Sequence, residues 1–495
     1  MKKLLLAAAI GAMAAMPFVA QAQQKDSVII GMRLEPAPGL DPTVASAAAI
    51  SQVTHYNVFE GLTRIDKGGA VGPMLAKSWT ISEDALTYQF DLVEGVKFHD
   101  GSDFTASDVR FVFERNAGDE SKNKEKAIFN GIETIETPDD HTVVVTLKAP
   151  NGLFLFKLAL AASVMVDPAS VETNATNPVG TGPYKFTKWT KGDSVELEKF
   201  ADHRNAANVQ IKTVKFRFIN DATAQVNALL AGDLDYMPSL SAPELFKQFQ
   251  NNPKFTALQG TTEGETILAM NNKGDVLSDI RVRKALMHAI DREALILGAV
   301  DGYGTPIGTH FAPHNPAYID LTAQSSYDPD KARALLKEAG YGDGLELSLA
   351  LPPPSYARRG GEIIAAMLAE VGVTAKIENV EWAKWLEETF RGKRYDLTII
   401  SHVEPMDIGR IYSDPNYYIQ YDSQDFRDIF AKFESATTDA DKTKFLQQAQ
   451  RKIADDAPVG FLFELAKLGV AQKGLTGMWP SWPSFINEVA ALRWN

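Results

Sequence analysis

The alternation of strands and helices between residues 345 and 401 constrains the fold more than any other feature of the sequence. Leucines at every second position predict a strand over 345–351, and similar alternation predicts strands over 373–377 and 395–401. Amphipathic stretches predict helices over 362–371, which Gly372 ends, and over 382–390. This βαβαβ order, with its short connections, predicts a parallel or mixed sheet flanked by helices.

A second block has the same character. Residues 212–236 are predicted to form a strand, a helix that Asp221 caps and Gly232 ends, and another strand. The stretch from 86 to 147 is rich in strands and contains one clear helix start, where Thr105 and Asp108 form a capping box. We therefore expect two α/β blocks, each with its own sheet, and a third, β-rich subdomain. A ligand is expected between the blocks or at the carboxyl ends of strands.

Composition excludes several classes of function. The 495 residues include 50 Lys and Arg against 63 Asp and Glu, a formal net charge of −13. The basic field that attracts nucleic acid or anionic membranes is therefore missing. The chain has no cysteine, which excludes disulfides, thiolate metal sites, Fe–S clusters and cysteine nucleophiles.

The first 22 residues have the pattern of a secretory signal. Lys2 and Lys3 precede an apolar run over 4–15, and Ala20-Gln21-Ala22 matches a small-x-small cleavage site. The apolar run is shorter than the ~20 residues that a membrane span needs. We expect cleavage after Ala22 and a free, soluble mature chain, because no lipobox cysteine is present.

No set of catalytic or metal-binding residues is visible in the sequence. The glycine-rich segment 180–184 (GTGPY) lacks the Lys-Ser/Thr of a phosphate loop, so a tight turn is the preferred interpretation. His310 and His314 are four residues apart, but Pro313 interrupts the helix that would place both on one face. Neither a GxSxG elbow nor an HExxH motif occurs. We expect no enzyme activity, no cofactor and no metal.

Five further segments stand out along the chain: 40–42 (LDP), 57–62 (NVFEGL), 97–109 (KFHDG followed by TASDV), 179–184 (VGTGPY) and 279–292 (DIRVRKALMHAIDR). In this order they resemble a known family, the extracytoplasmic solute-binding proteins of peptide-type ABC transporters, which bind dipeptides, oligopeptides or nickel. The last two segments are the most specific, and the resemblance covers essentially the whole mature chain.

The resemblance implies an α/β, two-lobed periplasmic binding protein fold with mixed sheets, an extra β-rich subdomain in lobe I and a hinged cleft between the lobes. Lobe I would span 23–265, with the subdomain at about 66–200, and the chain would return to it over 464–495. Lobe II would span 266–463, with hinges near 262–267 and 460–466. The resemblance also implies a periplasmic monomer that closes on a solute and delivers it to an inner-membrane permease.

The basic cluster of the 279–292 segment allows two interpretations. Val282, Leu286 and Ile290 lie on one helix face, so Arg281, Arg283 and Lys284 can stay solvated. Docking to the permease is the alternative.

Candidate ligand residues follow from the resemblance. In dipeptide-binding relatives, an acid after the strand that follows a Glu-Trp helix pairs with the α-ammonium of the ligand; here this acid corresponds to Glu404, with Asp407 one turn further on. A carboxylate that faces a cation in a closed cleft forms a strong, charge-assisted bond. Trp382 offers an aromatic wall. The alternatives are that either acid is a solvated loop residue and that Trp382 belongs to the core.

One segment departs from the family pattern. Relatives that hold a dipeptide carboxylate use an Arg-Pro-Tyr segment, whereas this chain reads PPPSYARR over 352–359. Tyr356 occupies this segment, and Arg358 and Arg359 in the following helix are the candidates to replace the missing arginine; the alternative is that both face water, as arginines in a first helical turn usually do. His402, after the last strand of the βαβαβ unit, completes the candidate set.

The departure leaves the ligand class open. A dipeptide, a longer peptide, an opine-like conjugate and another amine-bearing solute all remain candidates. A secreted hydrolase and a metal- or metallophore-binding member of the family are the alternative functions.

Overall fold

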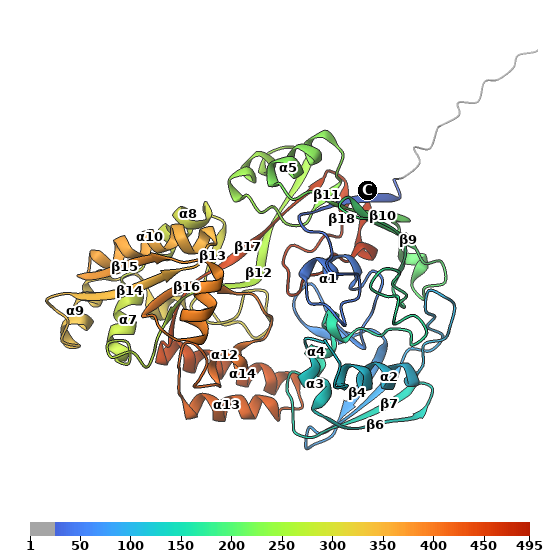
Figure 1. Ribbon diagram of the computed structural model, residues 1–495, viewed down its shortest axis with the longest axis horizontal. Helices are drawn as coiled ribbons and strands as arrows, with labels where there is room; N and C mark the ends of the chain where they lie inside the picture. The colour runs from blue at the N-terminus through green and yellow to red at the C-terminus, as the bar shows by residue number, and fades with distance from the viewer. Residues whose placement is uncertain (1–24) are drawn as a thin grey trace, which may run out of the picture.

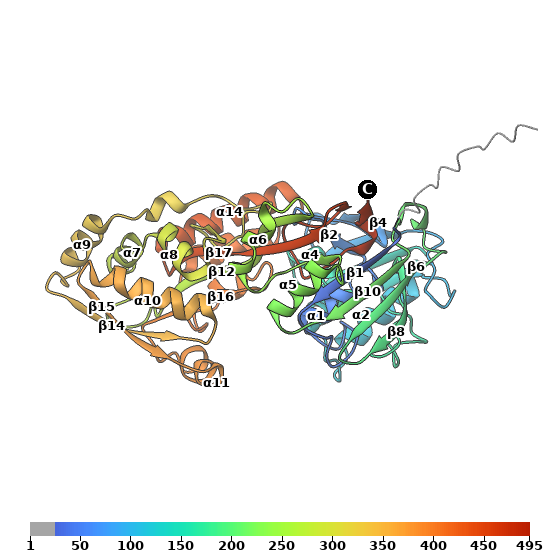
Figure 2. The ribbon, with the colours of Figure 1, turned by 90° about the horizontal axis from the view of Figure 1, so that it is seen from above.

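The computed structural model describes residues 25–495; the predicted signal segment 1–22 lies outside this range. Two lobes lie side by side, and the long strands β12 (Phe255–Met270) and β17 (Val459–Gln472) run between them (Figures 1 and 2). The α/β, two-lobed class is as expected from the resemblance.

One sheet of eleven strands passes through both lobes. Its order is β15-β14-β16-β12-β17-β11-β1-β10-β9-β8, and β13 pairs with β17. Besides β12 and β17 it contains β1 (Ser27–Met32), β8 (Tyr184–Thr190), β9 (Ser194–Lys199), β10 (Thr213–Phe218), β11 (Tyr236–Met237), β13 (Gly304–Pro306), β14 (Leu345–Leu351), β15 (Val373–Asn379) and β16 (Leu397–His402). The expectation of a separate sheet for each α/β block is therefore wrong, because the β12–β17 pair joins the two halves edge to edge.

The β-rich stretch forms its own sheet, as expected. Its order is β4-β5-β7-β6, from strands β4 (Ala76–Ile81), β5 (Thr87–Leu92), β6 (Ile132–Asp139) and β7 (Thr142–Leu147). Two small sheets pair β2 (Thr63–Ile65) with β3 (Val71–Pro73) and β18 (Leu475–Thr476) with β19 (Arg493–Trp494).

The helices divide between the lobes in chain order. The first part of the chain carries α1 (Ala48–Thr54), α2 (Ala106–Ala117), α3 (Lys126–Asn130), α4 (Phe154–Leu158), α5 (Ala222–Ala231) and α6 (Lys247–Gln250). The second part carries α7 (Ile280–His288), α8 (Arg292–Val300), α9 (Pro329–Glu338), α10 (Ser355–Ala369), α11 (Trp382–Lys384), α12 (Ile408–Tyr412), α13 (Gln424–Glu434) and α14 (Asp439–Asp456). A π-helical segment, η5 (Trp385–Arg391), continues α11. Short 3-10 turns are η1 (Ala161–Ser163), η2 (Ala206–Asn208), η3 (Pro243–Leu245), η4 (Thr322–Ser325) and η6 (Val489–Ala491).

Local signals placed several helix ends correctly. The Asp221 carboxylate accepts a hydrogen bond from the Ala224 amide, and Gly232 ends α5 with φ 84°. Thr105 and Asp108 form the predicted capping box of α2. α10 starts at Ser355, seven residues before the predicted start at 362. The prediction missed this part of the helix because its first turn is polar and shows no apolar periodicity.

The cores follow the two lobes. The largest core in lobe I combines residues between 28 and 258 with residues 471–494, so both ends of the described chain contribute to it. Lobe II has two cores, on the two faces of its part of the sheet, built from residues between 267 and 465.

Three of the sequence landmarks pack against one another inside lobe I. The Gly182 amide donates to the Val58 carbonyl, and the His99 amide donates to the Gly180 carbonyl, both at 2.9 Å. A Cβ atom on Gly180 or Gly182 would collide with the backbone of 57–58, which explains the glycines of this segment. The landmark glycines are therefore required by packing.

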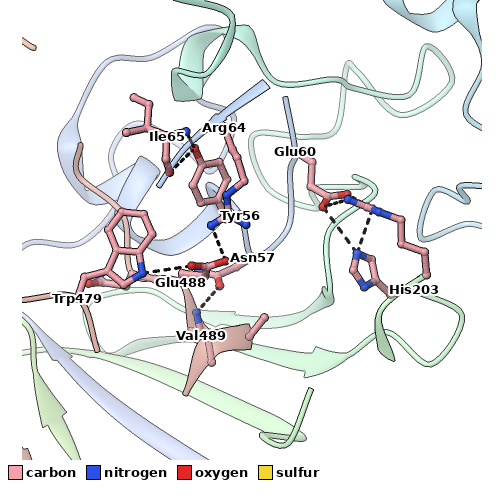
Figure 3. A network of polar contacts seen from close by, with 12 residues as sticks. Tyr56, Asn57, Glu60, Arg64, Ile65, His203, Trp479, Glu488 and Val489 are labelled. Carbon is pink, nitrogen blue, oxygen red and sulfur yellow. Dashed lines mark hydrogen bonds and ion pairs between the residues drawn. The ribbon is translucent and has the colours of Figure 1, made fainter. Parts of the chain in front are cut away.

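Charged groups hold the same region together (Figure 3). Glu60 is buried and receives two hydrogen bonds of 2.7 Å from the Arg204 guanidinium. Arg64 donates to Glu488 at 2.8 Å, which ties the N-terminal part of lobe I to the returning C-terminal segment. Burial opposes ionisation of Glu60, but Arg204 outweighs this effect and lowers the pKa of Glu60 to about 2.

The basic cluster of the 279–292 landmark is only partly solvated. Arg283 is buried and donates to the carbonyls of Leu277, Asp456 and Ala457. The expectation of a solvated Arg283 is therefore wrong: its guanidinium satisfies carbonyls at the end of α14, where the helix leaves its last acceptors free.

Candidate functional site

The predicted ligand residues gather at one edge of the lobe II sheet. β14 runs parallel to both β15 and β16, so the carboxyl ends of all three strands meet at this edge. Tyr356 and Arg358 lie in the first turn of α10 after β14, and Trp382 begins α11 after β15. His402 ends β16, and Glu404 and Asp407 follow in the segment 403–407, called here the β16–α12 loop. Figure 2 shows α11 on the side of lobe II that is turned towards lobe I.

Hydrogen bonds fix the backbone of this edge. The Ser401 amide donates to the Tyr356 hydroxyl at 3.1 Å, which joins α10 to β16. Trp385 donates from its indole to Thr398 at 3.0 Å and packs edge-on against Trp382 with centroids 5.7 Å apart. These contacts hold the backbone of the edge in place, and the exposed side chains described next are attached to it.

Exposed apolar side chains and the exposed acid Glu404 lie at this edge of the sheet. Trp382 is 42% exposed, and Leu386 and Val403 are also exposed. Glu404 is exposed, and within residues 25–495 its carboxylate takes part in no hydrogen bond or ion pair. Large apolar side chains left in water are typical of a binding surface.

Asp407 differs from its expected environment. Asp407 is a candidate ligand residue with a solvated loop acid as the alternative, but it is buried, at 3.1 Å from His310 Nε2 and 2.8 Å from Arg410 Nη2. Burial opposes its ionisation, yet these cations outweigh it and lower its pKa to about 2. Contacts with groups far away in the sequence explain the difference.

His402 is neutral at physiological pH. Burial lowers its pKa to about 4, and its Nε2 lies 3.0 Å from the Tyr418 hydroxyl. It supports the β16–α12 loop from inside the lobe and offers little surface to a ligand.

The two arginines are engaged with acids. Arg358 donates to Glu381 at 3.0 Å, and Arg359 donates to Asp301, at the end of α8, at 3.2 Å. The Arg358 pair lies beside Trp382 at the carboxyl edge, whereas Asp301 holds Arg359 towards the helices on the face of the sheet. Of the two, only Arg358 is placed near the other candidates.

A cavity of about 190 Å³ lies between the lobes. Lobe I contributes Val71 and Phe156, and lobe II contributes Pro316, Met406 and Leu446. Next to it the lobes touch, where the Gly152 amide donates to Glu434 at 2.8 Å. Because Met406 belongs to the β16–α12 loop, the loop that carries Glu404 also lines this interlobe space.

Sequence reasoning missed a group of buried residues behind this loop. His310 Nδ1 lies 2.6 Å from Glu265 of β12, and His314 Nε2 lies 2.5 Å from Glu263. The spacing of the two histidines was visible, but their partners come from β12, about 50 residues earlier. A periodicity argument restricted to one helix could not find them.

Among residues 25–495, no helix is long and apolar enough to cross a membrane.

Comparisons with known proteins agree with this architecture. Residues 70–425 match the model of bacterial extracellular solute-binding proteins, family 5. A glutathione-binding protein of Salmonella typhimurium is 33% identical over 346 residues, which are 68% of this chain and 66% of that protein.

Solved structures match over nearly the whole chain. The binding protein AgaA from A. tumefaciens R10, in complex with agropinic acid, is 27% identical, with a TM-score of 0.73 over 95% of this chain and 99% of that one. The murein tripeptide-binding protein MppA, in its unliganded open form, is 21% identical, with a TM-score of 0.85 over 95% of this chain and 97% of that one. With the family model covering well over half of its length, the chain belongs to the bacterial extracellular solute-binding proteins of family 5.

Proposed function

We propose that this protein is the periplasmic binding component of an ABC importer and captures a peptide or an amine-bearing, peptide-like solute between its lobes. The observation that carries the proposal is the interlobe cavity, because the β16–α12 loop with the exposed Glu404 takes part in lining it. A ligand bound there contacts both lobes and can stabilise only their closed arrangement. A glutathione-binding relative and an agropinic acid complex support a small organic solute.

The lobes in this structure touch at Gly152 and Glu434, but the cleft between them is open, in our interpretation. The TM-score is 0.85 with the unliganded open form and 0.73 with the liganded AgaA. The exposed Trp382 and Glu404 agree with this, because closure would cover them. We infer that the solute meets an open cleft first and that closure follows.

The division of the chain follows from the cores. We propose lobe I over 23–265 with its subdomain at about 66–200, lobe II over 266–463, and a return to lobe I over 464–495. The hinges near 262–267 and 460–466 are supported by the break in the β12–β17 register between Thr261 and Glu265, since an irregular ladder bends more easily than a regular one. Signal cleavage after Ala22, a monomeric state and delivery to a permease belong to the same proposal.

For the solute, we propose that Glu404 pairs with an ammonium group and that Trp382 covers its apolar part. Arg358 is the candidate for a carboxylate, in exchange for its present partner Glu381. Tyr356, His402 and Asp407 shape the edge from below. No catalytic step is needed for this function.

The test is a thermal-shift screen of the purified mature protein with glutathione, a dipeptide library, opines and simple amines. A ligand at 100 times its Kd is expected to add about 2.7 kcal/mol to the stability. Mass spectrometry must then recover the ligand unchanged. Turnover of the ligand that disappears with a single substitution would instead assign a hydrolase.

A further inference from the structure

Three adjacent strands, β16, β12 and β17, bring polar side chains together on one face of the sheet at the junction of the two lobes. In the β12 ladders, Glu265 is directly opposite His402 of β16 and directly opposite Glu464 of β17. Directly opposed residues in antiparallel strands point to the same face. The three side chains therefore form a row across the sheet, in the part of β12 that follows the irregular register.

Two further residues cover this row. His310 lies with Nδ1 2.6 Å from Glu265 and with Nε2 3.1 Å from Asp407, the last residue of the β16–α12 loop. One donor atom from each of these three residues lies within 4.8 Å of the other two. We call Glu265, His310, Asp407 and Glu464 the β12 cluster.

Glu464 supplies an independent observation. Its exposed fraction is 0%, and neither of its carboxylate oxygens has a hydrogen-bond partner in the described part of the chain. A buried carboxylate without a partner is costly, and natural proteins keep very few of them. Its place directly opposite Glu265 directs it to the same face of the sheet as Glu265.

The donor set matches a particular kind of ion. An imidazole nitrogen with carboxylate oxygens suits borderline divalent metals such as Zn²⁺, Fe²⁺ and Ni²⁺, whereas Ca²⁺ takes about six to eight oxygen ligands. A second layer of contacts is also present, since Arg410 donates to the other oxygen of Asp407 and Tyr412 packs edge-on against the His310 ring. Such outer contacts orient metal ligands in known sites.

We propose that the β12 cluster binds one divalent transition-metal ion of the Zn²⁺ class. The ion joins the two long strands β12 and β17 to the β16–α12 loop. It is therefore a structural ion that fixes the loop carrying Glu404 relative to the strands that connect the lobes. This site is separate from the exposed surface proposed for the solute.

The alternative is an imidazolium held between two carboxylates with no metal. Untagged protein, stripped with EDTA and dialysed, is titrated with ZnCl₂ by calorimetry, with CaCl₂ in a parallel titration and no solute present. The proposal predicts one Zn²⁺ per chain, no comparable binding of Ca²⁺, and a visible Co²⁺ spectrum with an imidazole ligand. A stripped protein that takes up no Zn²⁺ would overturn the proposal.

Variants locate the ion. His310→Gln and Glu464→Gln are each expected to weaken Zn²⁺ binding by about 100-fold or more, since losing even an outer contact costs about 10- to 100-fold. His314→Gln is the matched control, because His314 forms a similar pair with Glu263 on the same two segments and lies outside the cluster. Should His310→Gln fail to fold, the near-isosteric Glu464→Gln carries the test. Zn²⁺ binding that is unchanged in Glu464→Gln, or lost in His314→Gln alone, would contradict this assignment.

Discussion

In lobe I, the buried carboxylate of Glu60 has both oxygens engaged by Arg204 and also accepts from the Thr181 hydroxyl at 2.9 Å. At the hinge near 460–466, the equally buried Glu464 has no hydrogen-bond partner within residues 25–495. Both are glutamates in well-packed cores, so burial alone does not distinguish them. The paired carboxylate of Glu60 stabilises the folded protein, whereas the unpaired carboxylate of Glu464 destabilises it. A destabilising residue in an otherwise well-packed structure points to a function.

Breaking the lobe I pair is expected to have the largest effect. Glu60→Gln leaves the Arg204 guanidinium partly buried without a counter-charge, which costs about 3 to 5 kcal/mol of unfolding free energy. Urea denaturation measures it, with Glu370→Gln, an exposed glutamate, as the control.

The pH dependence of stability follows from the same pair. The pKa of Glu60 is lowered to about 2 from 4.5, so its contribution is present above pH 4.5 and is lost as the pH falls from 4.5 towards 2. Glu60→Gln should flatten this acid limb. An unchanged acid limb would mean that the pair does not stabilise lobe I.

Glu404, unlike the two buried glutamates, lies on the exposed surface that we propose for the solute. Glu404→Gln keeps the shape and removes the charge, and it is expected to weaken solute binding by about 2 to 5 kcal/mol, because closure leaves the ligand ammonium buried and unpaired. Titration calorimetry against the solute found in the screen measures this loss.

The control for this variant is Glu370→Gln, at the other end of α10, with an expected change under about 0.5 kcal/mol. The unfolding free energy of Glu404→Gln should stay close to that of the parent protein. Equal, small losses of affinity in both variants would show that Glu404 is only a solvated loop acid.

Replacing the unpartnered Glu464 is expected to raise the unfolding free energy, whereas replacing Glu60 is expected to lower it. In EDTA, Glu464→Gln is expected to raise the unfolding free energy by about 1 to 3 kcal/mol, because a buried carboxylate without partners is replaced by a neutral group. Urea denaturation of metal-free protein gives the value. A loss of stability as large as that of Glu60→Gln would erase the contrast between the two carboxylates.

A buried lysine, Lys467, extends the comparison to a positive charge, and its expected effect is on how the unfolding free energy changes with pH. Lys467 is buried against the Trp479 carbonyl and the Trp482 ring, and burial lowers its pKa to about 7. Between pH 7 and 10.5 the unfolded chain binds the extra proton, so stability should rise with pH by up to about 1.4 kcal/mol per unit. This rise should disappear in Lys467→Met and persist in Lys157→Met, whose lysine is paired with Glu125. Parallel curves for Lys467→Met and the parent protein would contradict the assignment.

Local sequence signals predicted much of the fold and one part of the site. The cap at Asp221, the capping box at Thr105 and the three strands of the βαβαβ unit depend on neighbours within a few residues, and the structure confirms them. The carboxyl edge of these strands was one of the two ligand positions that strand order predicted, whereas Trp382 and Glu404 became candidates through the family resemblance.

Long-range partners explain what the sequence could not predict. Arg283 is buried because carbonyls at 456 and 457 accept from it, and Asp407 is buried because His310 lies against it. The pairing of Glu265 with Glu464 depends on the register of two strands far apart in the chain. No periodicity within a segment encodes such contacts, which is also why the expected division into two sheets was wrong.

Small-angle X-ray scattering with and without the solute tests the central claim, capture by closure of the lobes, most directly. The protein is measured alone and with the solute from the screen at saturation, with binding verified by calorimetry on the same sample. The account predicts a smaller radius of gyration in the bound state, because the lobes close over Trp382 and Glu404. A solute that binds tightly while the scattering curve stays unchanged would contradict it.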